Sequence, residues 1–210
     1  MSVRKVAHGG HNIIGKFPSL KMGRMVSFES TIERDYVHLL EYEAQVEQFA
    51  EQPLTIEYMV NGKARHYTPD FKVESSNGIT LVECKPESRV EEEHNQHKFE
   101  TAAEWCERRG WAFEVVTDAE LRKGCYLSNV KALYRHAHRR VTNDTLTHAR
   151  SLVSKTPFSL KVLAAQIDPA QTAKIEADLQ CFVFHHALYM DIANDPLTCD
   201  SLVYWTGNAS

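Results

Sequence analysis

A helical pattern of apolar residues runs from Glu29 to about Tyr42. Its apolar positions return every three or four residues and share one face: Ile32, Tyr36, Leu39 and Leu40. Ser27 or Ser30 is placed to cap this helix, and Glu33 would complete a capping box if Ser30 is the cap. The pattern predicts an amphipathic helix that packs one side against the rest of the protein.

Three strand patterns follow. Residues 54–60 alternate between apolar and polar side chains and end at Asn61-Gly62, a strong hairpin signal. Residues 64–73 form a second strand that a proline interrupts, and Ser76-Asn77-Gly78 marks the next turn. Residues 79–85 are apolar enough for a central strand. We therefore expect an antiparallel meander.

A second helix and a fourth strand complete this part of the pattern. The helix covers residues 88–109 and ends at Gly110, and the strand covers residues 111–117. A strand, helix and strand of this length predict a parallel pairing with a right-handed crossover. The predicted order is α-β-β-β-α-β, with further helices from Asp118 to about His138.

The pattern changes in the last third of the chain. Three helices are predicted there, at residues 144–153, 159–167 and 172–188. Residues 188–205 contain two short apolar runs around an Asn-Asp-Pro sequence, which predicts a hairpin and gives a winged-helix outline. We expect three parts: an extended basic arm at 1–28, a mixed α/β domain at 29–140 and a winged-helix-like domain at 141–210.

Two of the predicted strands carry the residues that indicate chemistry. Asp70 comes early on one of these strands, and Glu83 and Lys85 lie two apart on the neighbouring strand. Residues i and i+2 of a strand face the same side, and the turn between the strands folds them antiparallel. Two carboxylates and an ammonium group would then converge. The side chain of Cys84 points to the opposite face, and its main-chain carbonyl remains available as a further metal ligand.

This constellation fits hydrolysis of a phosphodiester. Carboxylates are hard oxygen ligands for Mg²⁺, which lowers the pKa of a bound water and offsets charge on phosphate oxygens. A lysine beside the metal can orient or deprotonate that water, or stabilise the pentavalent state. The alternative is that Glu83 and Lys85 form a surface ion pair. The residues Pro69-Asp70 followed by Glu83-x-Lys85 match the PD-(D/E)xK nuclease pattern, which favours the chemical reading.

A third carboxylate is expected from the helix that precedes the sheet. The candidates are Glu29, Glu33, Glu41 and Glu43. Glu33 lies one turn before Tyr36 and Val37, inside the segment that must pack on the sheet. A solvated helical glutamate is the alternative for each of them.

Charge is distributed unevenly, although the net charge is only −4. Residues 1–28 contain five basic residues and no acid, and a second basic stretch runs from Lys131 to Arg150. Such segments can supply phosphate contacts to DNA, the alternative being a solvated surface. The candidate DNA contacts are Lys16, Lys21, Arg24, Arg139 and Arg140.

Hydropathy and cysteine usage set the cellular context. No stretch approaches 18 consecutive apolar residues, and the N-terminus lacks the apolar region of a secretory signal. The five cysteines form no CxxC pair, and the pairs His8/His11 and His94/His97 have no cysteine at zinc-ligand spacing. We expect a cytoplasmic protein with reduced thiols, no zinc site and no contact with a membrane.

Several short motifs between residues 15 and 120 resemble TnsA, the endonuclease subunit of heteromeric Tn-seven-like transposases. They are Phe28-Glu29-Ser30, Glu33, Leu39-Leu40-Glu41, Gln52-Pro53, Tyr67-Thr68-Pro69-Asp70-Phe71 and Glu83-Cys84-Lys85-Pro86. The segment from Gly15 to Met22 is similar to that of the shorter members, which include those carried with CRISPR systems. The resemblance implies an α/β (α+β) protein with a restriction-endonuclease-like mixed sheet core and a small winged-helix-like domain.

The resemblance also implies a role in cut-and-paste transposition in the bacterial cytoplasm. TnsA-like proteins cut the non-transferred strand at the 5′ ends of the element, using Mg²⁺ or Mn²⁺. The DDE-type transposase TnsB cuts and joins the 3′ ends, and the ATPase TnsC recruits both to the target. By motif position, Glu33 takes the place of the helical catalytic glutamate, Asp70 of the metal-bridging aspartate and Lys85 of the catalytic lysine. Glu83 fills a position where some members have glutamine.

Two other functions fit the same residues. A stand-alone restriction or repair nuclease of the same fold would cut DNA without a partner. A non-catalytic DNA-binding scaffold subunit would be indicated by loss of a metal ligand, whereas all the polar groups are present. A winged-helix transcription regulator would leave the motif around Asp70 and Glu83 without a role.

Overall fold

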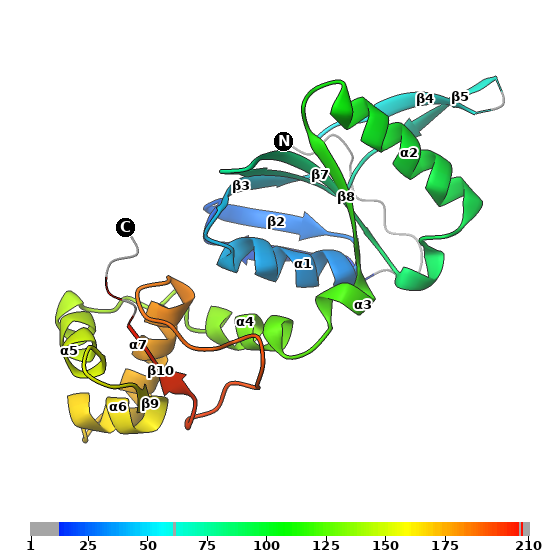
Figure 1. Cartoon of the computed structure of the whole chain (residues 1–210). Coiled ribbons are helices and arrows are strands. Elements are labelled where there is room, and N and C mark those ends of the chain that lie inside the picture. Colours follow the sequence, from blue (N-terminus) through cyan, green and yellow to red (C-terminus); the bar gives the residue numbers. More distant parts are fainter. Residues whose placement is uncertain (1–12, 61, 206, 208–210) are drawn as a thin grey trace. The chain divides into compact units, whose positions relative to one another are not determined.

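The computed structural model describes residues 13–60, 62–205 and 207, and it divides them into two compact units (Figure 1). The first unit ends at Leu121 and the second begins at Arg122, whereas the sequence places this boundary after residue 140. A buried side chain explains the difference. The amide of Asn129 donates to two main-chain carbonyls of the second unit, at 2.9 and 2.8 Å. The helix that carries Asn129 therefore belongs with the C-terminal part.

A four-stranded mixed sheet forms the centre of the first unit (Figure 1). Its order is β3-β6-β7-β8, with β7 and β8 parallel, as the crossover predicts, and the other neighbours antiparallel. The strands are β3 (Val46–Glu51), β6 (Phe71–Ser75), β7 (Gly78–Lys85) and β8 (Ala112–Thr117). Because Leu81 and Val82 are both fully buried, β7 is covered on both faces and is the central strand.

Helices cover the two faces of this sheet. Helix α1 (Thr31–Tyr42) packs Tyr36 against Phe71, on the face that carries Val82. Helix α2 (Glu93–Glu107) buries Ala102 and Cys106 in a cluster with Leu81, on the opposite face. The sequence-predicted order is therefore present as α1, β3, β6, β7, α2 and β8. Three short elements complete the connections: a 3₁₀ turn η1 (Glu87–Arg89), helix α3 (Asp118–Leu121) and an inserted hairpin.

The hairpin corrects the prediction for the first strand. Residues 54–60 are predicted to open the meander, but β4 (Ile56–Val60) pairs only with β5 (Lys63–Tyr67), in a separate two-stranded ribbon. The predicted second strand is split between this ribbon and the main sheet, because Pro69 has no N–H group to donate. Strand β3 occupies the position in the main sheet that the sequence pattern assigned to residues 54–60. Its apolar alternation is broken by a bulge after Val46, which hides it in the sequence. Asn61 of the predicted turn lies outside the described residues.

The predicted extended arm is also corrected. Strands β1 (Gly15–Ser19) and β2 (Arg24–Phe28) form an antiparallel hairpin whose apolar residues are buried: Phe17, Val26 and Phe28. A buried carboxylate holds the turn, because Glu41 of α1 accepts hydrogen bonds from the Ser19 hydroxyl and from the N–H of Leu20. Two strands of five residues carry too few alternations to be recognised. Residues 1–12 of the predicted arm, with His8 and His11, lie outside the described residues.

The second unit is mostly helical. Its helices are α4 (Tyr126–Tyr134), α5 (Asn143–Val153), α6 (Leu160–Ile167) and α7 (Thr172–Phe184). The predicted hairpin at residues 188–205 is reduced to one bridge between Tyr189 and Tyr204, and β10 (Leu202–Val203) pairs instead with β9 (Phe158–Ser159). In total, the described residues form seven α-helices, one mixed four-stranded sheet and three two-stranded antiparallel sheets. None of the described helices is long and apolar enough to cross a bilayer.

We expect Leu81→Ala to lower the free energy of unfolding by about 2–5 kcal/mol, because it opens a cavity beneath the central strand. Met59→Ala is the matched control, since Met59 is 66% exposed on the β4–β5 hairpin and its loss should cost under about 0.5 kcal/mol. Urea unfolding of both variants tests this. Equal effects would mean that β7 is not the centre of the core.

Candidate active site

The register of β6 and β7 brings the motif residues together. Phe71 pairs with Val82, so Asp70 stands opposite Glu83, and Lys85 follows two residues later on the same face. The carboxylate of Asp70 accepts a hydrogen bond from the N–H of Cys84, with Oδ2 at 2.7 Å from the nitrogen. The side chain of Cys84 is buried. The convergence expected from the two strands is present in the structure.

Glu83 is bonded through both of its carboxylate oxygens. Oε1 lies 2.9 Å from the Lys85 amino nitrogen and 2.6 Å from that of Lys98, on α2. Oε2 accepts the Tyr67 hydroxyl at 2.8 Å. The sequence analysis missed Tyr67 and Lys98. A signal for Lys98 exists, because it lies three residues after Asn95 and four before Ala102, on the buried stripe of its helix.

The start of α1 positions the third carboxylate. The Ser30 hydroxyl caps the helix and accepts the N–H of Glu33 at 3.1 Å, and Glu33 in turn accepts the N–H of Glu29 at 2.7 Å. This reciprocal pair resembles the predicted capping box, shifted by one residue. Of the four candidate glutamates, Glu29 and Glu33 line the same cleft as Asp70. Glu41 instead supports the N-terminal hairpin.

Gln52 ties this helix start to the strand of Asp70. Its N–H donates to the Asp70 carbonyl at 2.8 Å, and its side-chain amide donates to Glu29 at 2.7 Å. Gln52 has a φ of 44°, in the left-handed region that non-glycine residues rarely adopt. The two hydrogen bonds help to hold this costly backbone conformation beside the site.

A cleft of about 430 Å³ opens at this position. It is lined by residues of α1, of the segment before β6 and of the end of β7, among them Glu29, Glu33, Asp70, Lys85 and Arg89. Three acidic groups and two basic groups thus share one concave surface.

The electrostatics of the cleft are those of crowded carboxylates. Burial raises the pKa of Asp70 well above its ordinary value, and repulsion from Glu83 and Glu33 raises it further. Burial also raises the pKa of Glu33. Burial alone would lower the pKa of Lys85, but attraction by Glu83 and Asp70 outweighs it and leaves that pKa raised. A cation bound between the carboxylates would relieve their repulsion.

The residues present fit a hard divalent cation. Glu33 and Asp70 offer carboxylate oxygens on a common cleft, which is the donor chemistry that Mg²⁺ and Mn²⁺ prefer. Glu83 would have to exchange one of its present partners to join them. As the side chains stand, no three His, Cys, Asp or Glu groups within the described residues already have ligand geometry. A ligand role for the Cys84 carbonyl stays a prediction.

Three of the five candidate DNA contacts are engaged within the protein. The Lys21 amino group donates to the carbonyls of Leu40 and Glu43 at the end of α1. Arg24 forms a two-pronged ion pair with Glu51, at 2.8 and 2.6 Å.

In the second unit, Arg139 pairs with the buried Asp178, at 2.8 and 2.7 Å. Lys16 and Arg140 are exposed to solvent. Among the five candidates, Lys16 and Arg140 can therefore reach a phosphate without giving up one of the contacts described for Lys21, Arg24 and Arg139.

We expect Asp70→Asn to stabilise the metal-free protein at neutral pH, because the charged carboxylate is penalised by burial and by its neighbours. The folded pKa lies above the unfolded one, so this penalty disappears as the pH falls toward the ordinary value of 3.8. Urea unfolding with a chelator, at neutral and acidic pH, measures the difference. Glu107→Gln, on the exposed end of α2, is the control. Equal or lower stability of Asp70→Asn at neutral pH would contradict the expectation.

The comparisons with known proteins agree with this geometry. Residues 43–118 match the family described as TnsA-like endonuclease N terminal. No curated protein matches the chain. The matched region contains Asp70, Glu83, Lys85 and Lys98, and it stops short of Glu33. Residues 43–118 are therefore similar to the N-terminal domain of TnsA-like endonucleases.

Proposed function

We propose that the protein is a metal-dependent DNA endonuclease subunit of a cut-and-paste transposase. It hydrolyses the phosphodiester at the 5′ ends of the transposon, on the non-transferred strand. The observation that carries the proposal is the cleft at which Glu33 and Asp70 lie beside Lys85, within and next to the TnsA-like region.

Each residue has a role in this reaction. Glu33 and Asp70 would hold Mg²⁺ or Mn²⁺, with Glu83 as a further ligand, and the bound ion supplies an activated water and charge neutralisation. Attraction by Glu83 and Asp70 raises the pKa of Lys85 in the metal-free site, which favours its protonated form. It therefore acts as a cation that orients the water and stabilises charge on the phosphate oxygens.

The similarity of residues 43–118 to TnsA-like endonucleases supports a proposal for the partners. We infer that the protein works in the bacterial cytoplasm on transposon-end duplexes, together with a DDE transposase of the TnsB kind and an ATPase of the TnsC kind. We also assign residues 141–210 to a winged-helix-like domain that contacts these partners. The chain order α5, β9, α6, α7 and β10 supports this assignment, because a short strand between the first two helices and a returning strand fit a winged helix.

The decisive experiment is cleavage of an end-labelled transposon-end duplex in Mg²⁺, with and without the cognate transposase. We expect cuts at the 5′ ends only when the transposase is present. Asp70→Ala and Lys85→Ala should each reduce cutting by about 100-fold or more, because each removes a group that acts in the transition state. Lys72→Ala is the matched control, a lysine on the neighbouring strand that pairs with Glu74. It should cut like the wild type.

Other outcomes would change the assignment. Cutting that persists in the Asp70 and Lys85 variants would place the active site elsewhere. Robust cutting by the protein alone would identify a stand-alone restriction or repair nuclease. Binding of DNA with no cutting under any condition would leave a scaffold role.

We expect Arg140→Glu to weaken DNA binding equally for transposon ends and unrelated duplexes, because a phosphate contact carries no sequence information. The slope of affinity against salt should fall by about one charge. Arg139→Met, the control, should lower the stability of the second unit instead, since it breaks the pair with Asp178. Binding titrations at several salt concentrations test this. An unchanged affinity and salt slope for Arg140→Glu would remove it from the DNA surface.

A further inference from the structure

A second lysine reaches the Glu83 carboxylate from α2. Lys98 projects from α2 and places its amino nitrogen 2.6 Å from Oε1 of Glu83, closer than that of Lys85 at 2.9 Å. Glu83 is only 4% exposed, so both ion pairs are largely removed from water. Two ammonium groups therefore share one carboxylate oxygen, while Tyr67 holds the other oxygen.

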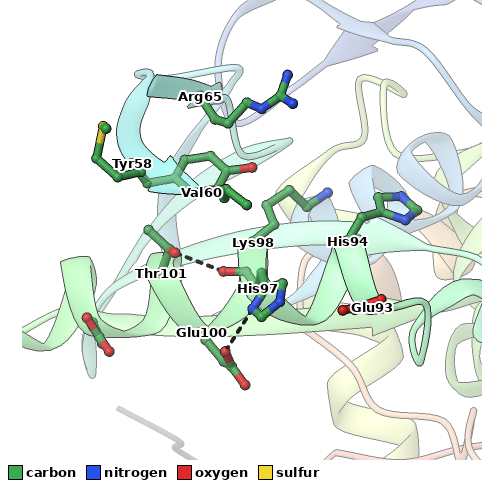
Figure 2. Close-up of a pocket in the computed structure, with 11 residues that line it drawn as sticks. Tyr58, Val60, Arg65, Glu93, His94, His97, Lys98, Glu100 and Thr101 are labelled. Carbon is green, nitrogen blue, oxygen red and sulfur yellow. Dashed lines mark hydrogen bonds and ion pairs between the residues drawn. The ribbon is translucent and has the colours of Figure 1, made fainter. Parts of the chain in front are cut away.

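The surroundings of Lys98 fix the position of its amino group. Its nitrogen lies 4.9 Å from the centre of the Tyr67 ring and 5.1 Å from that of Phe99. Its side chain is 15% exposed and borders a pocket of about 740 Å³ between α2 and the β4–β5 hairpin. Figure 2 shows Lys98 and His94 on the side of α2 that faces the hairpin.

Stability alone does not require a lysine at this position. A buried ion pair costs much of its own attraction in lost hydration, and apolar side chains of similar size often stabilise a protein as well or better. The neighbours of Lys98 on the buried stripe of α2 are mostly apolar or small, so a methionine would fit the pattern of the helix. Packing alone therefore does not explain the charge at this position, which leaves room for a use in the site.

That use follows from the charges around Glu83. Lys85 has two tasks that compete: it pairs with Glu83, and it must turn toward a phosphate in the cleft. If Lys85 were the sole cation beside Glu83, this turn would leave a buried carboxylate without a counter-charge. Lys98, on α2, contacts the same oxygen and would stay there as the counter-charge.

We propose that Lys98 is a positioning residue of the nuclease site, which holds Glu83 in place and neutralises it while Lys85 engages the scissile phosphate. This inference rests on the proposed nuclease function and deepens it. In this assignment Lys98 touches neither the substrate nor the attacking water, and it acts entirely through Glu83. It makes the first turns of α2 part of the active site, in addition to the two motif strands.

The test compares Lys98→Met with Lys98→Arg in single-turnover cleavage of the transposon-end duplex, with the transposase present. Lys98→Met should slow cleavage at saturating DNA by about 10- to 100-fold with little change in the DNA concentration needed for half-maximal rate. Lys98→Arg should recover most of the rate, because it restores the charge. Arg65→Met is the matched control: Arg65 lines the same pocket from β5, and its loss should leave the rate unchanged.

A double-variant cycle separates positioning from general damage. If Lys98 acts through Glu83, adding Lys98→Met to Glu83→Gln should slow cleavage no further than Glu83→Gln alone. The wild type, Lys98→Met, Glu83→Gln and the double variant are also compared by thermal unfolding, with a chelator and without DNA. The effects of the two substitutions on stability should again be non-additive. Lys98→Gln replaces Lys98→Met throughout if the methionine variant does not fold.

Each result decides the proposal. Wild-type cleavage by Lys98→Met, or effects of the two substitutions that simply multiply, would overturn it while the nuclease function stands. If the wild type does not cut DNA at all, the proposed function fails, and the unfolding cycle then decides the contact. Additive unfolding effects would overturn a positioning role for Lys98, and non-additive effects would sustain its hold on Glu83.

Discussion

The hydrogen-bonded register between β6 and β7 is the constraint on which the site depends. The turn at Ser76-Asn77 pairs Ser75 with Gly78, and every later pair up to Phe71 and Val82 follows from that choice. A slip of one residue would move Glu83 and Lys85 to the face of α1 and Val82 to the face of α2. Burial of Leu81 and Val82 on opposite faces therefore protects the chemistry as well as the core.

Crowded negative charge is the cost of this arrangement, and several local devices offset it. The N–H of Glu29 donates to the Glu33 carboxylate, which also lies near the positive end of the α1 dipole. The N–H of Cys84 serves Asp70, and two lysines and a tyrosine serve Glu83. Each carboxylate is thus held by donors that keep it in place, while Glu33 and Asp70 still face the cleft.

The sequence predicts those parts of the site that depend on local periodicity. Asp70, Glu83 and Lys85 converge because strands alternate with period two and one short turn joins the strands. Glu33 could be preferred among its neighbours because it lies one turn before Tyr36 and Val37, on the helix that must pack on the sheet. The functional assignment of these residues stays a prediction, since geometry alone does not test it.

The remaining features depend on partners that are distant in the chain. Lys98 meets Glu83 only because α2 packs on β7, and Arg24 pairs with Glu51 only because β2 lies beside β3. The hairpin β1–β2 and strand β3 have short or bulged patterns, so tertiary packing rather than local preference selects them. These pairings cannot be predicted from a single sequence, because the residues that pair are far apart in the chain.

The β4–β5 ribbon leaves and re-enters the fold at one point. Glu51 pairs with Phe71, and the N–H of Gln52 meets the Asp70 carbonyl, so the chain departs from the sheet and returns to it at adjacent positions. The length and the tip of this hairpin can therefore change without altering any strand pair of the main sheet. The base of the hairpin is more constrained, because the Tyr67 hydroxyl donates a hydrogen bond to Glu83. The outer part of the β4–β5 hairpin can therefore change in evolution without altering the site, whereas its base must keep Tyr67 next to Glu83.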